Sequence, residues 1–245
     1  MKADPAVQRR LLDLAEFDAE LSRVNHRRRT LPELAEISEV EKELRTKRDA
    51  LIAVQTTLGD LDRDVRRQET EIDQVRSRRD RDQALLDAGT VSAKQLNDLQ
   101  HELATLQRRQ SALEDDLLEL MERREAVDAD VQRSQAEVDA AEQRLADATG
   151  RRDEALADLE STEAKRLADR ELVVKRFPED LLALYERVRK NKGIGAALVR
   201  GRRCGACRLE LDRSALGKLR EAAADEVVCC EECGAIMVRT GESGL

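Results

Sequence analysis

The sequence contains few of the residues that form the core of a globular domain. Its 245 residues include two Phe, one Tyr and no Trp, together with only 11 Gly and 3 Pro. A compact domain of this length normally buries several aromatic side chains and uses Gly and Pro in its turns. Charged residues make up 39% of the chain. This composition excludes a wide aromatic core and is typical of long helices that bury a narrow seam.

Long apolar runs are also absent from the sequence. The N-terminal stretch MKADPAVQRRLLDLAEFDAE is charged from its second residue and does not resemble a signal peptide. The uncharged run GIGAALV near the C-terminal end is far shorter than the roughly 20 residues that span a bilayer. We therefore expect a cytoplasmic protein without membrane contact, in a reducing compartment where disulfides are rare.

The apolar residues present before position 175 recur with the seven-residue period of a coiled coil. Gly89 and Ser92 separate two such registers, and these residues suit the end of one helix and the start of the next. We therefore predict an antiparallel coiled-coil hairpin over 1–175 with a turn near 88–92; one continuous helix is the alternative. The first register contains Ile37, Leu44, Leu51, Leu58, Val65 and Ile72, and the second contains Leu96, Leu103, Leu117, Val131, Val138 and Leu145.

A proline and a glycine predict an interruption of this hairpin. The pairing that places Leu44 opposite Val138 also places Pro32 opposite Gly150. Proline removes a backbone donor from one helix, and glycine weakens the other. We therefore expect a bend or break near 30–32 and near 150, with the N-terminal helix returning to the neighbourhood of residue 170.

The cysteines all lie in the C-terminal region, for which we predict a short helix plus a zinc ribbon over 176–245. Cys204 and Cys207 form one C-x-x-C motif, and Cys230 and Cys233 form a second, each beside a predicted strand. Paired motifs of this kind predict one zinc ion held by four thiolates. Disulfides and an iron site of the rubredoxin type are the alternatives. A four-thiolate site leaves no coordination position for a substrate, so the zinc is expected to be structural.

Cys229 is the fifth cysteine and does not fit the second motif, because it stands four positions before Cys233. If the segment is a strand, the side chains of Cys229 and Cys230 point to opposite faces. We therefore predict that Cys229 is not a ligand.

Residues that would support catalysis are not recognisable. Neither His26 nor His101 lies near a candidate nucleophile in the sequence, and both are expected to be solvated helix residues. The sequence has no G-x-x-x-x-G-K-[ST] phosphate-binding loop. We therefore expect no enzymatic activity and no small-molecule substrate.

Charge is distributed unevenly along the chain. Residues 1–170 carry 30 Lys and Arg against 40 Asp and Glu, whereas residues 171–245 carry 14 against 12. A stretch of eight cations without an acid predicts contact with the phosphate backbone of RNA or DNA. The competing interpretation is local compensation of the zinc-thiolate charge and of the acidic helices. The eight residues are Arg187, Arg189, Lys190, Lys192, Arg200, Arg202, Arg203 and Arg208.

Residues 185–238, which contain both C-x-x-C motifs and the basic stretch, resemble the bacterial C4-type zinc-ribbon family that has an N-terminal coiled-coil hairpin. The resemblance implies the same four cysteine ligands and a role in nucleic-acid binding. Some members act as adaptors for an alternative sigma factor and for export components. The sequence departs from the family at Cys229, and at Ala235 and Ile236, where a basic residue often follows the glycine.

These observations predict a mainly α protein in which a long antiparallel coiled-coil hairpin is followed by a small β-rich zinc ribbon. The expected function is that of a non-enzymatic adaptor, with nucleic acid bound at the ribbon and proteins bound along the coiled coil. The alternative is a purely protein-binding scaffold, chaperone or regulatory adaptor, for example of transcription or secretion components. An accessory subunit of an enzyme is a third hypothesis.

Overall fold

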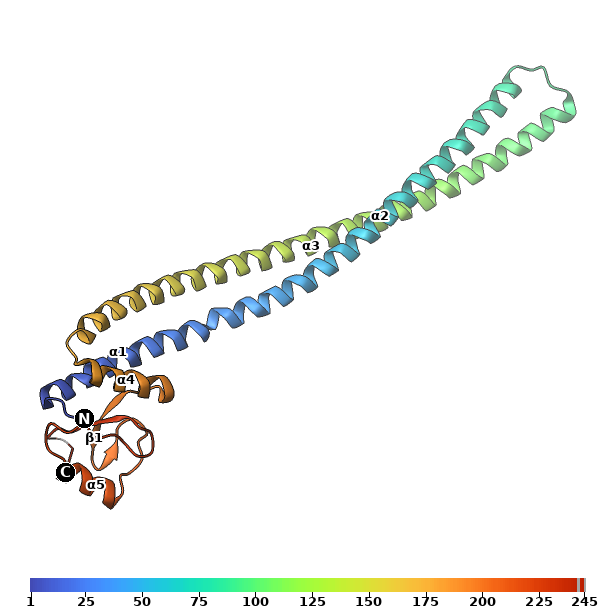
Figure 1. Ribbon diagram of the computed structural model, residues 1–245. Coiled ribbons are helices and arrows are strands. Elements are labelled where there is room, and N and C mark those ends of the chain that lie inside the picture. Colours follow the sequence, from blue (N-terminus) through green and yellow to red (C-terminus); the bar gives the residue numbers. More distant parts are fainter. Residues whose placement is uncertain (242, 245) are drawn as a thin grey trace. The chain divides into compact units, whose positions relative to one another are not determined.

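The computed structural model describes residues 1–241, 243 and 244. Within these residues the chain is mainly helical, and a small three-stranded sheet follows the helices (Figure 1). This confirms the predicted fold class. The elements are α1 (Pro5–Arg29), α2 (Pro32–Asp87), α3 (Ala93–Val174), α4 (Glu179–Lys192), β1 (Ala196–Arg200), β2 (Arg203–Cys204), α5 (Arg213–Glu221) and β3 (Ile236–Val238).

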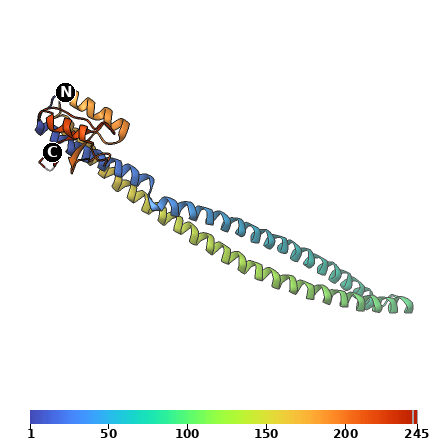
Figure 2. The ribbon, with the colours of Figure 1, turned by 90° about the horizontal axis from the view of Figure 1, so that it is seen from below.

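The chain divides into two compact units, residues 35–149 and residues 1–34 together with 150–245. In the first unit, α2 and α3 form an antiparallel hairpin, visible from below in Figure 2. Its buried cluster contains Leu44, Leu51, Val138 and Ala141, with Val131 packed against it. Leu44 and Val138, the pair expected from the heptad register, therefore lie in one core. Ion pairs such as Lys47–Glu137, at 2.8 Å, join the outer edges of the two helices.

The hairpin turn lies between Asp87 and Ala93. Gly89 adopts a left-handed conformation with φ +65°, which glycine reaches without steric cost. The backbone N–H of Ser92 donates to the side chain of Gln95 at 2.9 Å, and the Gln95 N–H points back to the Ser92 hydroxyl at 3.4 Å. This reciprocal pair caps the start of α3.

The two predicted interruptions have different outcomes. The helix is interrupted between Arg29 and Pro32, where proline takes the first position of α2. Proline is tolerated there because its missing N–H would lack a helical partner in any case. In contrast, α3 continues without interruption through Gly150, so the helix does not break there. Glycine keeps its backbone donor and costs a helix only about 1 kcal/mol relative to alanine.

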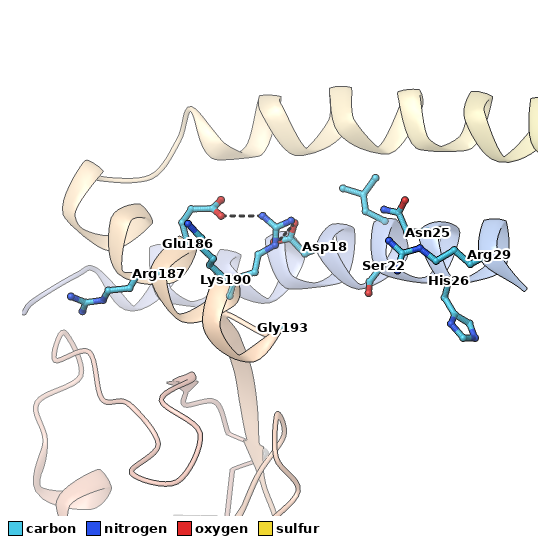
Figure 3. Close-up of a pocket in the computed structure, with 11 residues that line it drawn as sticks. Asp18, Ser22, Asn25, His26, Arg29, Glu186, Arg187, Lys190 and Gly193 are labelled. Carbon is cyan, nitrogen blue, oxygen red and sulfur yellow. Dashed lines mark hydrogen bonds and ion pairs between the residues drawn. The ribbon is translucent and has the colours of Figure 1, made fainter.

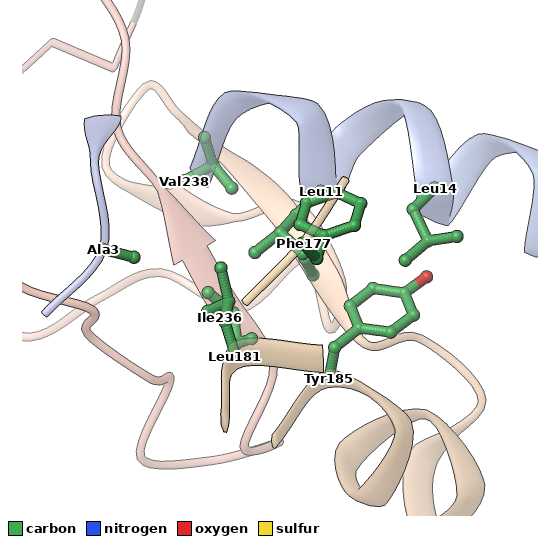
Figure 4. Packing of buried hydrophobic residues seen from close by; sticks show 9 residues of the cluster. Ala3, Leu11, Leu14, Phe177, Leu181, Tyr185, Ile236 and Val238 are labelled. Carbon is green, nitrogen blue, oxygen red and sulfur yellow. The ribbon is translucent and has the colours of Figure 1, made fainter. Parts of the chain in front are cut away.

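In the second unit, α1 packs along the last turns of α3 and against α4. Arg28 and Arg166 on these helices form ion pairs with Glu163 and Glu20, respectively. A larger core joins the helices to the sheet and contains two of the three aromatic side chains of the chain (Figure 4). Its buried members are Ala3, Leu11, Leu14, Phe177, Leu181, Tyr185, Ala196, Ile236 and Val238.

The sheet has the order β2-β1-β3, with β1 antiparallel to β2 and parallel to β3. Successive side chains of a strand point to opposite faces. Ile236 and Val238 of β3 therefore enter the helical core, whereas Met237 packs in a second cluster with Cys204 and Cys230. The sheet thus separates the helical core from the cysteine-rich core.

The N-terminal residues add a further backbone contact to the ribbon. The N–H of Ala3 donates to the carbonyl of Asp225 at 2.7 Å, and the N–H of Val227 donates to the carbonyl of Met1 at 3.1 Å. Gln8, which is buried, donates to the Ala3 carbonyl at 2.8 Å. Residues 1–3 therefore hold the ribbon against α1, in the neighbourhood expected from the sequence.

Across the described residues, no helix combines the length and the apolar character that a membrane span requires.

Candidate metal centre and basic surface

The two C-x-x-C motifs form backbone turns with the same hydrogen bonds. In the first, the Cys204 N–H donates to the Leu209 carbonyl at 3.0 Å, and the Arg208 N–H donates to the Cys204 carbonyl at 2.8 Å. In the second, Cys230 and Gly234 donate to the corresponding carbonyls of Ala235 and Cys230 at 2.9 and 2.8 Å. The two loops are therefore equivalent turns that present their cysteines to one point.

The four motif cysteines fit a single zinc ion. Their Sγ atoms all lie within 4.8 Å of one another. The Sγ atoms of Cys204 and Cys233 are 3.8 Å apart, and those of Cys207 and Cys230 are 4.0 Å apart. Tetrahedral coordination with Zn–S bonds of about 2.3 Å places the sulfur atoms about 3.8 Å apart. The residues therefore match a closed structural site for one zinc ion.

The backbone around the site favours thiolates. N–H groups of Cys207 and Ala206 point at the Cys204 sulfur, although burial outweighs them and raises the pKa of that thiol. A hydrogen bond from the Leu209 N–H lowers the pKa of Cys207. Burial raises the pKa of Cys233 to about 12. A zinc ion must therefore displace protons from buried thiols, and once bound it would tie the two turns together.

Cys229 lies outside this group. Its side chain is half-buried and packs against the helical core, on the other face of the sheet from Cys230. Burial raises the pKa of the Cys229 thiol, so the proton is retained. The alternation of side chains along an extended chain accounts for this separation.

The eight predicted basic residues do not have equivalent environments. Arg189 is bound within the protein, because its guanidinium contacts Asp18 at 3.1 Å and Glu186 at 3.0 Å. The other seven are exposed, and none of them forms an ion pair with any residue that the structure describes. They are Arg187, Lys190 and Lys192 on α4, Arg200 on β1, Arg202 in the following turn, Arg203 on β2 and Arg208 after the first motif.

Two of these arginines adopt a backbone conformation that normally favours glycine. Arg202 has φ 62° and follows Gly201, φ 56°, in the two-residue turn between β1 and β2. Arg208 has φ 63° at the position that Gly234, φ 76°, occupies in the second motif. Such a conformation costs a non-glycine residue roughly 1–2 kcal/mol. Both side chains are nevertheless exposed at the ribbon surface.

Asp18 anchors α4 to α1 and α3, a feature that sequence reasoning missed. Its side chain is 4% exposed and accepts hydrogen bonds from the Tyr185 hydroxyl at 2.6 Å and from Arg170 Nε at 2.7 Å. Burial opposes the charge of Arg170, but its bonds to Asp18 and Glu186 raise the pKa overall. The sequence places an acid, Asp18, on the apolar face of an amphipathic helix. This pattern does not identify the residues that Asp18 contacts.

A cleft of about 950 Å³ lies between α1 and α4, beside this network (Figure 3). Ser22, Asn25, His26 and Arg29 line it from α1, and Arg187 and Lys190 line it from α4. Residues of α1 were not among the predicted site residues. These residues of α1 lie near the basic stretch only in the folded protein, and no local sequence pattern predicts that they do. His26 and His101 are both exposed, as expected.

The fold and the site together define a class of protein, a long helical hairpin that carries a C4-type zinc ribbon. Residues 14–193 match the family model of the CT398-like coiled coil hairpin domain, and residues 203–237 match that of the C4-type zinc ribbon domain. The chain therefore belongs to the CT398-like coiled-coil hairpin family, and its cofactor is one structural zinc ion.

Relatives of similar length support this assignment. The chain is 46% identical to protein Rv2229c of Mycobacterium tuberculosis over 98% of each sequence. A solved structure from Mycobacterium smegmatis has 43% identity and a TM-score of 0.88, and the match covers 98% of this chain and 100% of that one. The structure of CT398 from Chlamydia trachomatis has 17% identity and a TM-score of 0.65 over 95% and 97% of the two chains, so it shows a shared fold alone.

Proposed function

We propose that the protein is a non-enzymatic adaptor that contacts the phosphate backbone of RNA or DNA through its ribbon and binds proteins through its helical hairpin. The observation that supports nucleic-acid contact most is the set of seven exposed cations without an ion pair to any described residue. Compensation of the zinc-thiolate charge requires only two positive charges, because Zn²⁺ with four thiolates has a net charge of −2. The remaining charge is available to an external anion.

The conformations of Arg202 and Arg208 strengthen this proposal. Glycine would relieve the left-handed backbone at both positions, yet each carries an exposed guanidinium. Backbone strain retained at an exposed charged side chain is a reason to assign that side chain a role. Guanidinium groups bind phosphate oxygens in a bidentate manner. No aromatic side chain lies in residues 187–208, so contacts would be made to the backbone and not by base stacking.

A salt titration of RNA and DNA binding tests this function. The variant Arg200→Glu/Arg202→Glu/Arg203→Glu is compared with wild type and with Arg66→Glu/Arg81→Glu/Arg109→Glu. The control changes the same charge at exposed arginines of α2 and α3 that have no ion pair among the described residues. We expect the ribbon variant to reduce the slope of log K against log salt by about 1 for each phosphate that the variant no longer binds. Absence of salt-dependent binding by the wild type would overturn nucleic-acid contact and leave the protein-binding scaffold as the function.

Protein binding along the hairpin is supported by exposed apolar side chains on α3. Leu118 is 60% exposed and Met121 is 49% exposed. Residues three apart lie on the same face of a helix. Co-purification from cells with wild type and with Leu118→Lys/Met121→Lys tests this part. A partner retained equally by both proteins would show that this face is not the binding surface.

A further inference from the structure

The cleft between α1 and α4 has the charge of an anion-binding site. Its walls contain two acids, Asp18 and Glu186, and both are engaged with Arg170 and Arg189. Three further cations line it, namely Arg29, Arg187 and Lys190. These three form no ion pair with a residue that the structure describes, and all three are exposed. The cleft therefore carries a positive charge that its own acids do not neutralise.

The α1 wall of the cleft also carries several kinds of hydrogen-bonding group. Ser22, Asn25, His26 and Arg29 line the cleft from α1 at spacings of three, one and three, and Figure 3 shows Ser22 and His26 pointing to one side of this helix and Asn25 to the other. Figure 3 shows the Arg29 side chain running back along α1 in the direction of Asp18. Hydroxyl, amide, imidazole and guanidinium groups are the donors that proteins use to bind phosphate oxygens.

The cleft ends where the chain enters the ribbon. Gly193, which lines the cleft, ends α4 with φ 84°, and β1 begins three residues later at Ala196. Arg187 and Lys190 of the cleft wall lie on α4 together with Lys192, and α4 leads into β1, which carries Arg200. A single extended polyanion could therefore contact both regions of this compact unit.

We infer that the α1–α4 cleft binds backbone phosphates of the same nucleic-acid strand that contacts the ribbon. This inference rests on the proposed function and extends the contact from the cations of α4 and the ribbon to residues of α1. The residues that line the cleft include no Phe, Tyr or Trp, and Tyr185 beside it is buried and bonded to Asp18. It is therefore suited to phosphates and not to stacked bases.

The two histidines of the chain allow a direct test. His26 lines the cleft, whereas His101 lies on the exposed surface of α3 in the other unit. The zinc-loaded full-length protein, labelled at histidine, is titrated with a single-stranded RNA or DNA of roughly 10 nucleotides, within the range of known single-strand site sizes. We expect the NMR signals of the His26 ring to shift during the titration and those of the His101 ring to remain unchanged.

The outcomes of this titration separate the two proposals. Binding without a shift of His26 would overturn the cleft and leave the ribbon as the contact site. Failure of either oligonucleotide to bind would overturn the proposed function and, with it, this inference. A difference between the RNA and DNA arms would identify which nucleic acid supplies the phosphates.

Paired substitutions provide a second test. Arg29→Gln/Lys190→Gln removes two cleft cations, and Arg27→Gln/Lys165→Gln removes one Arg and one Lys from exposed positions outside the cleft. We expect the cleft variant to lower the salt slope by about 2 and the control to leave it unchanged. A slope in the cleft variant equal to that of wild type would contradict the inference. Bound zinc and helical circular dichroism verify that both variants are folded.

Discussion

At the scale of single residues, the same backbone turn is occupied by Gly234 in one zinc-binding motif and by Arg208 in the other. Both have positive φ, at 76° and 63°. We expect Arg208→Gly to raise the free energy of unfolding by up to about 1 kcal/mol, because it relieves a left-handed conformation. The matched change Gly234→Ala creates that strain and should lower the free energy of unfolding by about 1–2 kcal/mol.

Denaturant unfolding of the zinc-loaded proteins measures both changes. If Arg208 is retained for phosphate contact, Arg208→Gly will also weaken binding of nucleic acid while it stabilises the fold. A loss of stability in Arg208→Gly would show that the arginine side chain makes a structural contact that outweighs the strain.

Cysteine substitutions test which thiols hold the metal. Cys230→Ser should abolish stoichiometric zinc, because it removes one of four sulfur atoms that converge within 4.8 Å. Cys229→Ser should retain the zinc, because that side chain packs against the helical core. Metal analysis of the purified variants checks both outcomes. Loss of zinc from Cys229→Ser, in a protein that remains folded, would contradict the assignment.

The single tyrosine reports on the Asp18 network. Burial and the hydrogen bond to Asp18 raise the pKa of Tyr185 well above its ordinary value of 10.0. Above pH 10 the unfolded chain loses the phenolic proton while the folded protein keeps it, so the stability that this bond contributes is present below pH 10 and declines as the pH rises. We expect tyrosinate absorbance to appear only together with loss of helical circular dichroism. Ionisation near pH 10 in a protein that is still folded would contradict this.

At the scale of elements, α3 shows how a sequence pattern can override a local weakness. Gly150 lies inside a continuous helix, and a Cβ built there meets no atom within 4 Å. Gly150→Ala should therefore stabilise the protein by about 0.5–1 kcal/mol. Gly89→Ala should destabilise it, because Gly89 has φ +65° in the turn. Thermal unfolding followed by circular dichroism compares the two; destabilisation by Gly150→Ala would indicate that the helix needs flexibility at that level.

At the scale of the whole molecule, the ribbon and the helices depend on different interactions. The ribbon cluster is small and includes all four zinc ligands, whereas the hairpin has its own apolar core. Small metal-binding domains commonly unfold when the metal is removed. The ribbon is also held through backbone bonds between residues 1–3 and residues 225–227.

Removal of zinc should therefore unfold the ribbon and leave the hairpin helical. After treatment with a chelator, we expect amide hydrogens of Ala3 and Val227 to exchange rapidly, while those of Leu51 and Val138 stay protected. Hydrogen exchange measured by mass spectrometry, with zinc restored as the control, tests this outcome. Unchanged protection at Ala3 would show that the N-terminal contact does not require the zinc-bound ribbon.

The sequence by itself determined the features that depend on local periodicity. Apolar residues every seven positions specify a helical seam, and two C-x-x-C motifs specify a four-thiolate site, because each pattern is complete within a short stretch of chain. The spare position of Cys229 follows in the same way from the alternation of side chains in an extended segment. A break of the helix at Gly150 does not occur, because the cost of one glycine is small beside the stability of a long helix.

Only the tertiary structure decided which distant residues meet. It joined Asp18 to Tyr185 and Arg189, and so withdrew one of the eight predicted cations into a structural network. It also brought Arg29 of α1 to the cleft beside α4. These contacts link residues that are far apart in the chain, and their geometry depends on how whole helices pack, which no local pattern specifies. The chemistry of the metal site was therefore readable from the chain, whereas the basic cleft beside the ribbon was not.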